Sequence, residues 1–321
     1  MRSWTMLVQL MDGQGVASRP PLPPCGGGLG RGVVHQDSLH SSPPSARLRG
    51  RACSPTRGER KQGAALSLAR LILTGSLSLA AFAARAAEMP KDFVYLRDID
   101  PTILQDMRYA GRDNFTGAKV PGYEAPECVL VRQAAEALKR VQADLRGKGL
   151  NLKVYDCYRP ARAVAAFVDW AKEPDDPHAK TTYYPNLPKG ALFPDYIATR
   201  SGHSRGATMD LTLVPTDVDA KASPAAEDPK PRPCTVPQKG KAPDGSLAMG
   251  TSFDCFDVKA NTAALGLSKE ERANRDVLVE AMQAHGFKNY PKEWWHFTLE
   301  PEPYPDTFFD FPIEPQGYSS R

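Results

Sequence analysis

Histidine and carboxylate residues occur close together at two places in the sequence. The stretch "SGHSRGATMDLTLV" contains His203 and Asp210, and "EWWHFTLE" contains Glu293 and His296. The Ser-Arg-Gly sequence after His203 allows a turn to carry the chain from a ligand in a loop to a ligand at the start of a strand. A zinc ion that performs hydrolysis needs three ligands drawn from His, Asp and Glu and one open position for water. His203, Asp210 and His296 satisfy that count, which predicts one zinc ion per chain.

Glu293 is the candidate for the basic group beside that water. It can fill this role only if the chain bends between Glu293 and His296, because on a straight strand the two side chains would point to opposite faces. Each signal has a simpler alternative: a single histidine on a strand is more often packed than a ligand, Glu-x-x-His arises often by chance, and Trp294 and Trp295 suit a core strand. The joint pattern favours a metal site.

Three helices and three strands are predicted to position these residues. Apolar residues at spacings of three and four mark the helices, which cover residues 129–149, 159–172 and 269–286. Ser268 and Glu271 form a capping-box signature at the start of the last helix. The strands cover residues 152–156, 209–214 and 294–299. Because helices and strands are mixed without a regular βαβ repeat, we expect a single α+β domain with a mainly antiparallel sheet flanked by helices, and the zinc site at the sheet.

Three segments lack such periodicity. Residues 1–60 are rich in Pro, Gly, Ser and Arg, so they are predicted to be disordered or to result from a misplaced translation start. Residues 174–194 are punctuated by proline, which predicts a loop. Residues 215–245 are rich in Pro, Lys, Asp and Ala, which predicts a surface insertion.

Residues 61–87 combine a basic start, an apolar run and a small-residue end, the pattern of a secretory signal peptide cleaved after Ala86 or Ala87. A membrane anchor is the alternative, but the apolar run is short and interrupted, so we expect no stable membrane span after cleavage. The exported protein would then be a zinc enzyme domain of residues 88–321 in the periplasm.

Four cysteines lie in this predicted domain. In an oxidising compartment an even number suggests two disulfides, for which three pairings are possible. We favour Cys128 with Cys157 and Cys234 with Cys255. Zinc ligation by thiolates is the alternative, although the sequence contains no Cys-x-x-Cys pair to support it.

The composition is that of an ordinary globular protein. The chain has 321 residues, of which 41% are hydrophobic and 24% are charged. The net charge of +4 and the pI near 8.6 come largely from basic residues before position 90, so we expect no nucleic-acid binding. The sequence does not determine the oligomeric state.

The two histidine stretches, together with "DMRYAGRDNFTG", "GYEAP", "YDCYRP" and "MGTSFDCFD", closely resemble the zinc D-alanyl-D-alanine dipeptidases of the VanX type. These enzymes share a Ser-x-His-x6-Asp and Glu-x-x-His pattern with a wider group of zinc DD-carboxypeptidases. The resemblance covers nearly all of residues 93–314 in the same order. It implies zinc held by His203, Asp210 and His296, with Glu293 as the catalytic base.

The resemblance also implies which residues contact the substrate. Arg159, in "YDCYRP", matches the family arginine that stabilises the tetrahedral intermediate; without the resemblance, a surface salt bridge would be the simpler interpretation. Asp254 matches the family's substrate-contacting aspartate and suits an ammonium group. Tyr109, Tyr123 and Ser201 match other pocket positions, with structural packing as the alternative for the two tyrosines.

The implied function is zinc-dependent hydrolysis of the free dipeptide D-Ala-D-Ala to two D-Ala. Export would direct this activity to cell-wall dipeptide turnover or nutrient use rather than to glycopeptide resistance. A zinc DD-carboxypeptidase acting on peptidoglycan stems is one alternative, against which Asp254 argues. A non-catalytic zinc-binding or cell-wall-binding module is another, but binding alone requires neither Glu293 nor Arg159.

Overall fold

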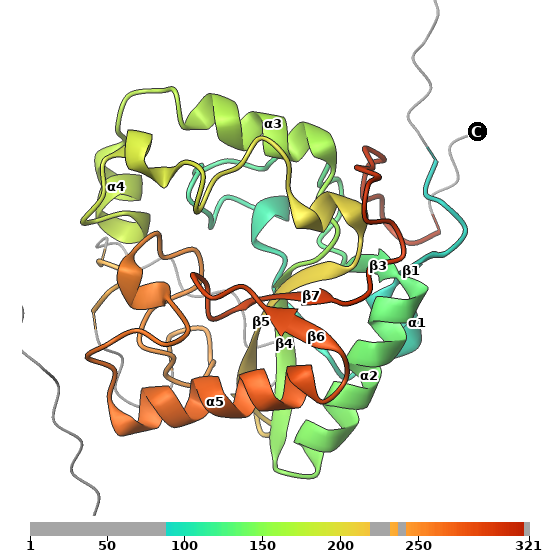
Figure 1. The fold of residues 1–321 in the computed structure, drawn as a ribbon. Coiled ribbons are helices and arrows are strands. Elements are labelled where there is room, and N and C mark those ends of the chain that lie inside the picture. Colours follow the sequence, from blue (N-terminus) through green and yellow to red (C-terminus); the bar gives the residue numbers. More distant parts are fainter. Residues whose placement is uncertain (1–87, 219–231, 237–241, 318–321) are drawn as a thin grey trace, which may run out of the picture. The chain divides into compact units, whose positions relative to one another are not determined.

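A computed structural model describes residues 88–218, 232–236 and 242–317 (Figure 1). The predicted N-terminal extension (1–60), the predicted signal peptide (61–87) and much of the predicted insertion lie outside the described residues. No helix in the described ranges is long and apolar enough to cross a membrane.

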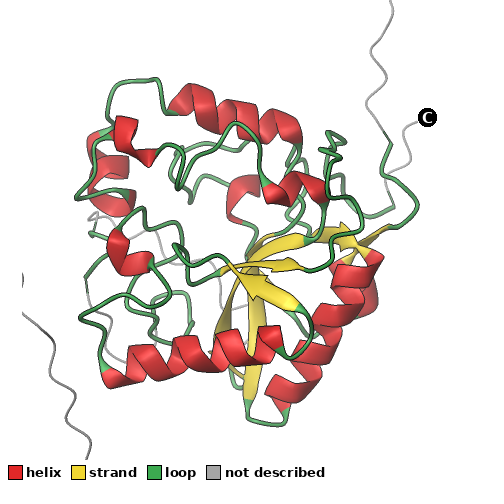
Figure 2. Cartoon of the chain, in the orientation of Figure 1, coloured by secondary structure: helices red, strands yellow, loops and turns green. Residues whose placement is uncertain are grey.

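Two sheets form the framework of the described chain (Figure 2). The main sheet has the strand order β2-β4-β5-β7-β6. Its strands are β2 (Leu104–Gln105), β4 (Leu150–Asp156), β5 (Thr208–Pro215), β7 (His296–Leu299) and β6 (Phe287–Asn289). Strand β2 runs parallel to β4, and the other neighbouring pairs are antiparallel. A smaller antiparallel sheet pairs β1 (Phe93–Tyr95) with β3 (Val129–Val131). The predicted α+β class with a mainly antiparallel sheet is confirmed.

The described chain also contains α-helices and short 3-10 helices. The α-helices are α1 (Leu96–Ile99), α2 (Arg132–Arg146), α3 (Ala161–Trp170), α4 (Pro177–Tyr183) and α5 (Lys269–Gln283). The 3-10 helices are η1 (Arg108–Ala110), η2 (Lys189–Leu192), η3 (Gly202–Arg205) and η4 (Val258–Ala260). Helices α2 and α5 pack against the main sheet and against each other, and α3 and α4 lie away from that pair (Figure 1).

The long helices form where the sequence predicted them. Helix α2 begins at Arg132 because residues 129–131 pair with β1 as a strand. Helix α5 begins with the predicted capping box, in which the Ser268 side chain accepts from the Glu271 backbone and the Glu271 carboxylate accepts from the Ser268 backbone. This exchange satisfies two backbone donors that the first turn leaves without partners.

The predicted loop over residues 174–194 is wrong in part, because it contains α4 and η2. Asp176 caps α4 by accepting a hydrogen bond of 2.7 Å from the backbone N–H of Ala179. Pro177 occupies the first turn, where its missing N–H has no helical acceptor to lose. The proline therefore marks a helix start at this point.

The end of the predicted surface insertion packs inward instead. The Asp244 carboxylate lies 2.8 Å from the Lys153 ammonium and accepts a hydrogen bond of 2.5 Å from the Tyr155 hydroxyl, both in β4. Lys153 is only 3% exposed. Because a buried ammonium needs an anionic partner, Asp244 fixes this end of the insertion against the sheet.

Both favoured disulfides are confirmed. Cys128–Cys157 joins the residue before β3 to the residue after β4, and Cys234–Cys255 joins a described part of the insertion to the segment before η4. All four side chains are buried. None of these thiols is therefore available as a metal ligand.

Gly206 makes possible the turn between η3 and β5. Its φ is +82°, in the left-handed region that L side chains rarely adopt. A Cβ added there would lie 2.3 Å from a ring carbon of Phe93. Glycine at this position therefore sets the path of the chain between His203 and Asp210.

We expect Gly206→Ala to lower the free energy of unfolding by at least about 2 kcal/mol, since left-handed strain and overpacking against Phe93 add. Chemical denaturation followed by circular dichroism measures the loss. Gly117→Ala is a matched control, because Gly117 also has a positive φ but has open space around it, so its loss should be about 1 kcal/mol. Equal losses in the two variants would show that the contact with Phe93 contributes nothing.

Candidate active site

Asp156, Asp210 and His296 stand in one row across the main sheet. The register pairs Asp156 of β4 with Asp210 of β5, and Asp210 with His296 of β7. Residues directly opposite each other on antiparallel strands point to the same face, so three distant parts of the sequence bring polar side chains together. His203 joins them from η3, which ends at Arg205 and is followed by Gly206 just before β5.

His203, Asp210 and His296 each bring one ligand atom to a common point. His203 Nε2 lies 3.3 Å from both His296 Nδ1 and Asp210 Oδ2, and His296 Nδ1 lies 3.0 Å from Asp210 Oδ1. The ligand atoms of a tetrahedral zinc ion stand about 3.3 Å apart, given bonds of about 2.0–2.1 Å. Asp210 Oδ1 is buried and, despite its short distance to His296 Nδ1, forms no hydrogen bond of normal geometry within the described residues. The donor set, its spacing and this unsatisfied oxygen fit a divalent cation.

Neighbouring groups favour the protonation state in which each of these three side chains can bind a cation. The Cys157 carbonyl, which can only accept, lies 2.7 Å from His203 Nδ1, so Nδ1 carries the hydrogen and Nε2 presents its lone pair to the other ligands. Burial lowers the pKa of His296, which favours the neutral ring that a metal requires. Burial alone would raise the pKa of Asp210, but His203 and His296 hold that pKa below its usual range.

The structure contains the bend between Glu293 and His296 that the proposed role of Glu293 requires. The chain turns between Glu293 and His296, with the His296 backbone N–H donating to the Glu293 carbonyl at 3.3 Å. This bend places Glu293 Oε2 3.4 Å from His296 Nδ1. Burial, followed by the negative charges of Asp210 and Asp254, raises the pKa of Glu293 well above its usual value. A carboxyl group with a raised pKa is suited to accept and return a proton.

Arg159 lies beside the ligand cluster and is held by Asp156. Its Nε and Nη2 donate to Asp156 Oδ2 at 2.9 and 2.8 Å, and Nη2 lies 3.7 Å from Asp210 Oδ2. The other Asp156 oxygen accepts a hydrogen bond of 2.6 Å from the Tyr123 hydroxyl. Because Asp156 is fully buried, a surface salt bridge does not describe this arginine. The sequence reasoning missed Asp156, although a carboxylate that ends an apolar strand three residues before an arginine could have indicated it.

A cavity of about 270 Å³ opens onto these groups. Its lining includes every residue proposed from the sequence except Tyr123: His203, Asp210, His296, Glu293, Arg159, Tyr109, Ser201 and Asp254. Tyr123 instead lies in contact with Asp156. Asp254 is 5% exposed, and its two oxygens accept from the Tyr109 hydroxyl at 2.9 and 3.1 Å. The lining residues Tyr290 and Trp295 had no distinguishing signal in the sequence.

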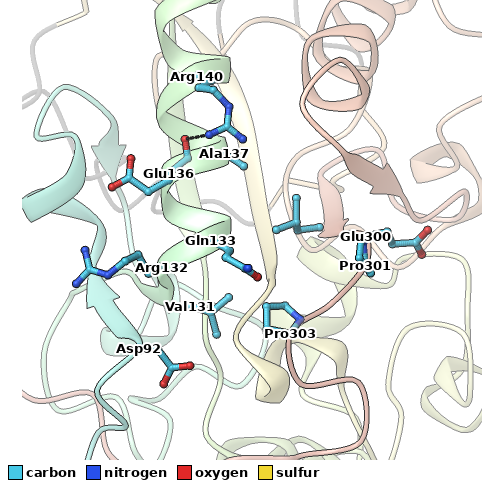
Figure 3. A pocket seen from close by; sticks show the side chains of 11 residues that line it. Asp92, Val131, Arg132, Gln133, Glu136, Ala137, Arg140, Glu300, Pro301 and Pro303 are labelled. Carbon is cyan, nitrogen blue, oxygen red and sulfur yellow. Dashed lines mark hydrogen bonds between the residues drawn. The ribbon is translucent and has the colours of Figure 1, made fainter.

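A second cavity, of about 700 Å³, has a different character (Figure 3). It lies between the first turns of α2, including Arg132 and Glu136, and the segment that contains Pro301 and Pro303. None of the residues proposed for catalysis, metal binding or substrate binding lines it. The smaller cavity therefore gathers the groups that can perform chemistry.

Comparison with known proteins agrees with this geometry. A family model described as D-ala-D-ala dipeptidase matches residues 89–223 and 241–314, which include every residue of the candidate site. The chain belongs to the D-Ala-D-Ala dipeptidase family. The resemblance inferred from the sequence motifs is thus confirmed.

Several family members are similar over most of this chain. It is 38% identical over 226 residues to the D-alanyl-D-alanine dipeptidase of Streptomyces coelicolor, a match that covers 70% of this chain and 100% of that protein. The Enterococcus faecalis D-alanyl-D-alanine dipeptidase is 35% identical with the same coverage. The Enterococcus faecium protein of the same name is 36% identical over 69% of this chain and 98% of its own.

Titration of the metal-free protein with Zn²⁺ is expected to show one bound ion per chain. Binding should be lost in His203→Ala, Asp210→Ala and His296→Ala but retained in Arg159→Ala, which serves as the control. An ion that binds only the folded chain stabilises it by about 2.7 kcal/mol when its free concentration is about 100 times the dissociation constant. Thermal unfolding with and without Zn²⁺ measures this stabilisation. If a histidine or aspartate variant still binds one ion, the residue replaced in that variant is not a ligand.

Proposed function

We propose that this protein hydrolyses the free dipeptide D-Ala-D-Ala to two D-Ala, with one zinc ion per chain. One observation carries the proposal: the His203, Asp210 and His296 ligand atoms and the buried Asp254 carboxylate line the same small cavity. The names of the relatives, all D-alanyl-D-alanine dipeptidases, support the choice of dipeptide.

Zinc is the proposed ion because two imidazoles and one carboxylate form a donor set that suits it. When bound, it would lower the pKa of a coordinated water towards about 7 and polarise the scissile carbonyl. His203, Asp210 and His296 would hold it, and the hydrogen bond from His203 to the Cys157 carbonyl would keep that ring in the orientation required.

Glu293 is the proposed proton carrier. Its carboxylate would accept the proton of the attacking water and later deliver it to the departing amino group. The raised pKa of Glu293, caused first by burial, supports this role because the protonated form must persist until the leaving group accepts the proton. The turn that ends at His296 directs the carboxylate towards the ligand cluster.

Arg159 is proposed to stabilise the negative charge that develops on the carbonyl oxygen. A guanidinium carries its charge at every relevant pH and presents donors in a fixed plane. Asp156 accepts from two nitrogens of Arg159 and so fixes the direction of that plane. Tyr123 acts on the site through its hydrogen bond to Asp156.

Asp254 is proposed to bind the ammonium group of the dipeptide. Burial, and then the negative charge of Asp210, raises the pKa of Asp254 well above its usual value, so the site is short of positive charge at that position. The substrate ammonium would supply it, with Tyr109 holding the carboxylate in place. Ser201, whose hydroxyl oxygen accepts from the His203 backbone, presents a further polar group to the cavity.

The size of the cavity favours a dipeptide over a peptidoglycan stem. Its volume of about 270 Å³ lies below the roughly 300–1,000 Å³ typical of pockets for drug-sized ligands. A DD-carboxypeptidase must accommodate a long chain on the amino side of the cut bond, where Asp254 would remain buried without an ammonium partner.

We propose that the enzyme acts in the periplasm after cleavage of a signal peptide at residues 61–87, which would release a domain beginning near residue 88. The start of the family match at residue 89 supports that boundary. Two disulfides support an oxidising compartment. The corresponding role is turnover or nutrient use of cell-wall dipeptides.

The test of the reaction compares D-Ala-D-Ala, L-Ala-L-Ala, N-acetyl-D-Ala-D-Ala and a pentapeptide ending in D-Ala-D-Ala as substrates of the zinc-loaded protein. We expect rapid release of D-Ala from D-Ala-D-Ala alone. Glu293→Gln should lower kcat by about 10²- to 10⁴-fold, since it removes the general base, and should still bind zinc. Glu280→Gln, a substitution of an exposed residue of α5 outside the cavity, is the matched control. Cleavage of the pentapeptide would replace the proposal with a carboxypeptidase, and binding of zinc without any cleavage would indicate a non-catalytic module.

The role of Asp156 is tested separately. Asp156→Asn keeps the side-chain size but turns an acceptor of the Arg159 guanidinium into a neutral group, so kcat should fall about 10- to 100-fold while zinc remains bound. Tyr123→Phe removes only the hydrogen bond to the other oxygen and should cause a smaller loss. Steady-state kinetics and zinc titration measure both, and an unchanged kcat in Asp156→Asn would contradict the positioning of Arg159.

A further inference from the structure

The two disulfides stand beside different halves of the proposed site. Cys157 lies between Asp156 and Arg159 in the chain, and its carbonyl is the partner of His203 Nδ1 at 2.7 Å. Cys255 directly follows Asp254, the residue proposed to bind the substrate ammonium. One bridge is thus adjacent to the metal side of the cavity and the other to its substrate side.

Asp254 needs such support because of its backbone conformation. It is the only non-glycine residue of the described ranges with a positive φ, at 57°. L residues rarely occupy this region, and they remain there only when surrounding contacts determine the conformation. The conformation directs the carboxylate to the Tyr109 hydroxyl and into the cavity.

Cys234 links the turn that carries Asp254 to α4, alongside a direct hydrogen bond from the Phe256 N–H to the Tyr183 carbonyl at 2.8 Å. Besides the disulfide, the Cys234 carbonyl accepts from the Ser252 backbone at 3.2 Å, and the Cys234 N–H donates to the Thr182 carbonyl at the end of α4 at 3.0 Å. On the other side, the Phe253 ring stacks on Tyr155 of β4 at 4.6 Å. The Asp254 turn is therefore fixed to both α4 and the main sheet.

We infer that the Cys234–Cys255 disulfide positions Asp254 and so determines affinity for the dipeptide, whereas the Cys128–Cys157 disulfide positions the Cys157 carbonyl and so determines affinity for the metal. Both bridges act through other residues and are positioning elements. The inference rests on the proposed function, because it assigns the Asp254 side of the cavity to the substrate ammonium.

The two bridges are natural controls for each other. They close loops of similar length, with sequence separations of 29 and 21 residues, and all four cysteines are buried. Loop-closure entropy changes slowly with loop length, so removing either bridge should lower stability to a similar extent. If removing the two bridges affects binding differently, the difference therefore reflects where each bridge lies in the site and not a general loss of stability.

The experiment compares Cys234→Ala/Cys255→Ala with Cys128→Ala/Cys157→Ala. Alanine is chosen because freed thiols could bind zinc. The measurements are kcat and KM for D-Ala-D-Ala, Zn²⁺ affinity by competition with a chelator, and dipeptide affinity by calorimetry in the inactive Glu293→Gln background. Thermal unfolding records the stability of each protein.

Removing Cys234–Cys255 should raise KM and the calorimetric dissociation constant of the dipeptide about tenfold or more, with Zn²⁺ affinity unchanged. Removing Cys128–Cys157 should weaken Zn²⁺ binding about 10- to 100-fold, as loss of a group that orients a ligand does. In an Asp254→Asn background, removing Cys234–Cys255 should have no further effect on dipeptide affinity, because the bridge acts through Asp254.

Three outcomes would overturn the inference. Both double variants could change Zn²⁺ and dipeptide affinity in parallel with their melting temperatures, which would indicate general loosening. The effect of removing Cys234–Cys255 could persist in full in the Asp254→Asn background. If Cys234→Ala/Cys255→Ala does not fold, Phe253→Leu loosens the same turn from the side of Tyr155, and an unchanged KM in that variant would overturn the inference.

The same experiment separates this inference from the proposed function. If the protein with both bridges intact neither binds nor cleaves D-Ala-D-Ala, the proposed function is wrong, and so is the inference that depends on it. If that protein binds and cleaves the dipeptide but its dipeptide affinity is unchanged when Cys234–Cys255 is removed, the inference alone is wrong.

Discussion

Four carboxylates, those of Asp156, Asp210, Asp254 and Glu293, are buried in or directly behind one small cavity, and their mutual repulsion is the constraint on which the site depends. Removing such groups from water is costly unless each finds a positive charge or a proton. Asp156 has the Arg159 guanidinium. Asp210 faces two imidazoles and, in the proposed holoenzyme, the metal. Glu293 has a raised pKa and can hold a proton. The pKa of Asp254 is raised as well, and under the proposed function the ammonium of the dipeptide would supply the positive charge that lets this carboxylate ionise.

In the proposed reaction, substrate binding and chemistry share one cavity. A substrate ammonium would be attracted where the protein lacks a cation, and the polarised carbonyl would then lie among groups already arranged to donate, accept or attract. Such an arrangement has to be rigid, because a carboxylate that is free to rotate would form hydrogen bonds with water or with another group. The site is accordingly surrounded by fixed elements: the row across β4, β5 and β7, the buried Asp156 with its two partners, and the disulfides of Cys157 and Cys255.

Membership of the D-Ala-D-Ala dipeptidase family agrees with the geometry of the site. The family match identifies a likeness over most of the chain, but by itself it assigns no role to a residue. The distances among His203, Asp210 and His296 and the unsatisfied Asp210 oxygen supply a physical reason to place a cation there. The disulfides place Cys157 beside Asp156 and Cys255 beside Asp254, and such bridges form where thiols are oxidised.

The sequence alone predicted the candidate residues that the structure brings to one cavity, and it was sufficient for the α+β class, for the capping box of α5 and for the favoured cysteine pairing. Those inferences rest on local pattern, on motif resemblance or on a small number of possible pairings. Tertiary structure decided the rest. Glu293 reaches the ligand cluster because the chain turns before His296 instead of continuing as a straight strand. Asp156 could be recognised as part of the site only from the strand register, which places it beside Asp210, and from its contact with Arg159. Asp244 likewise proved to be a buried ion-pair partner of Lys153, since long-range pairing of charges is set by how the chain folds back on itself and leaves no periodic signal in the sequence.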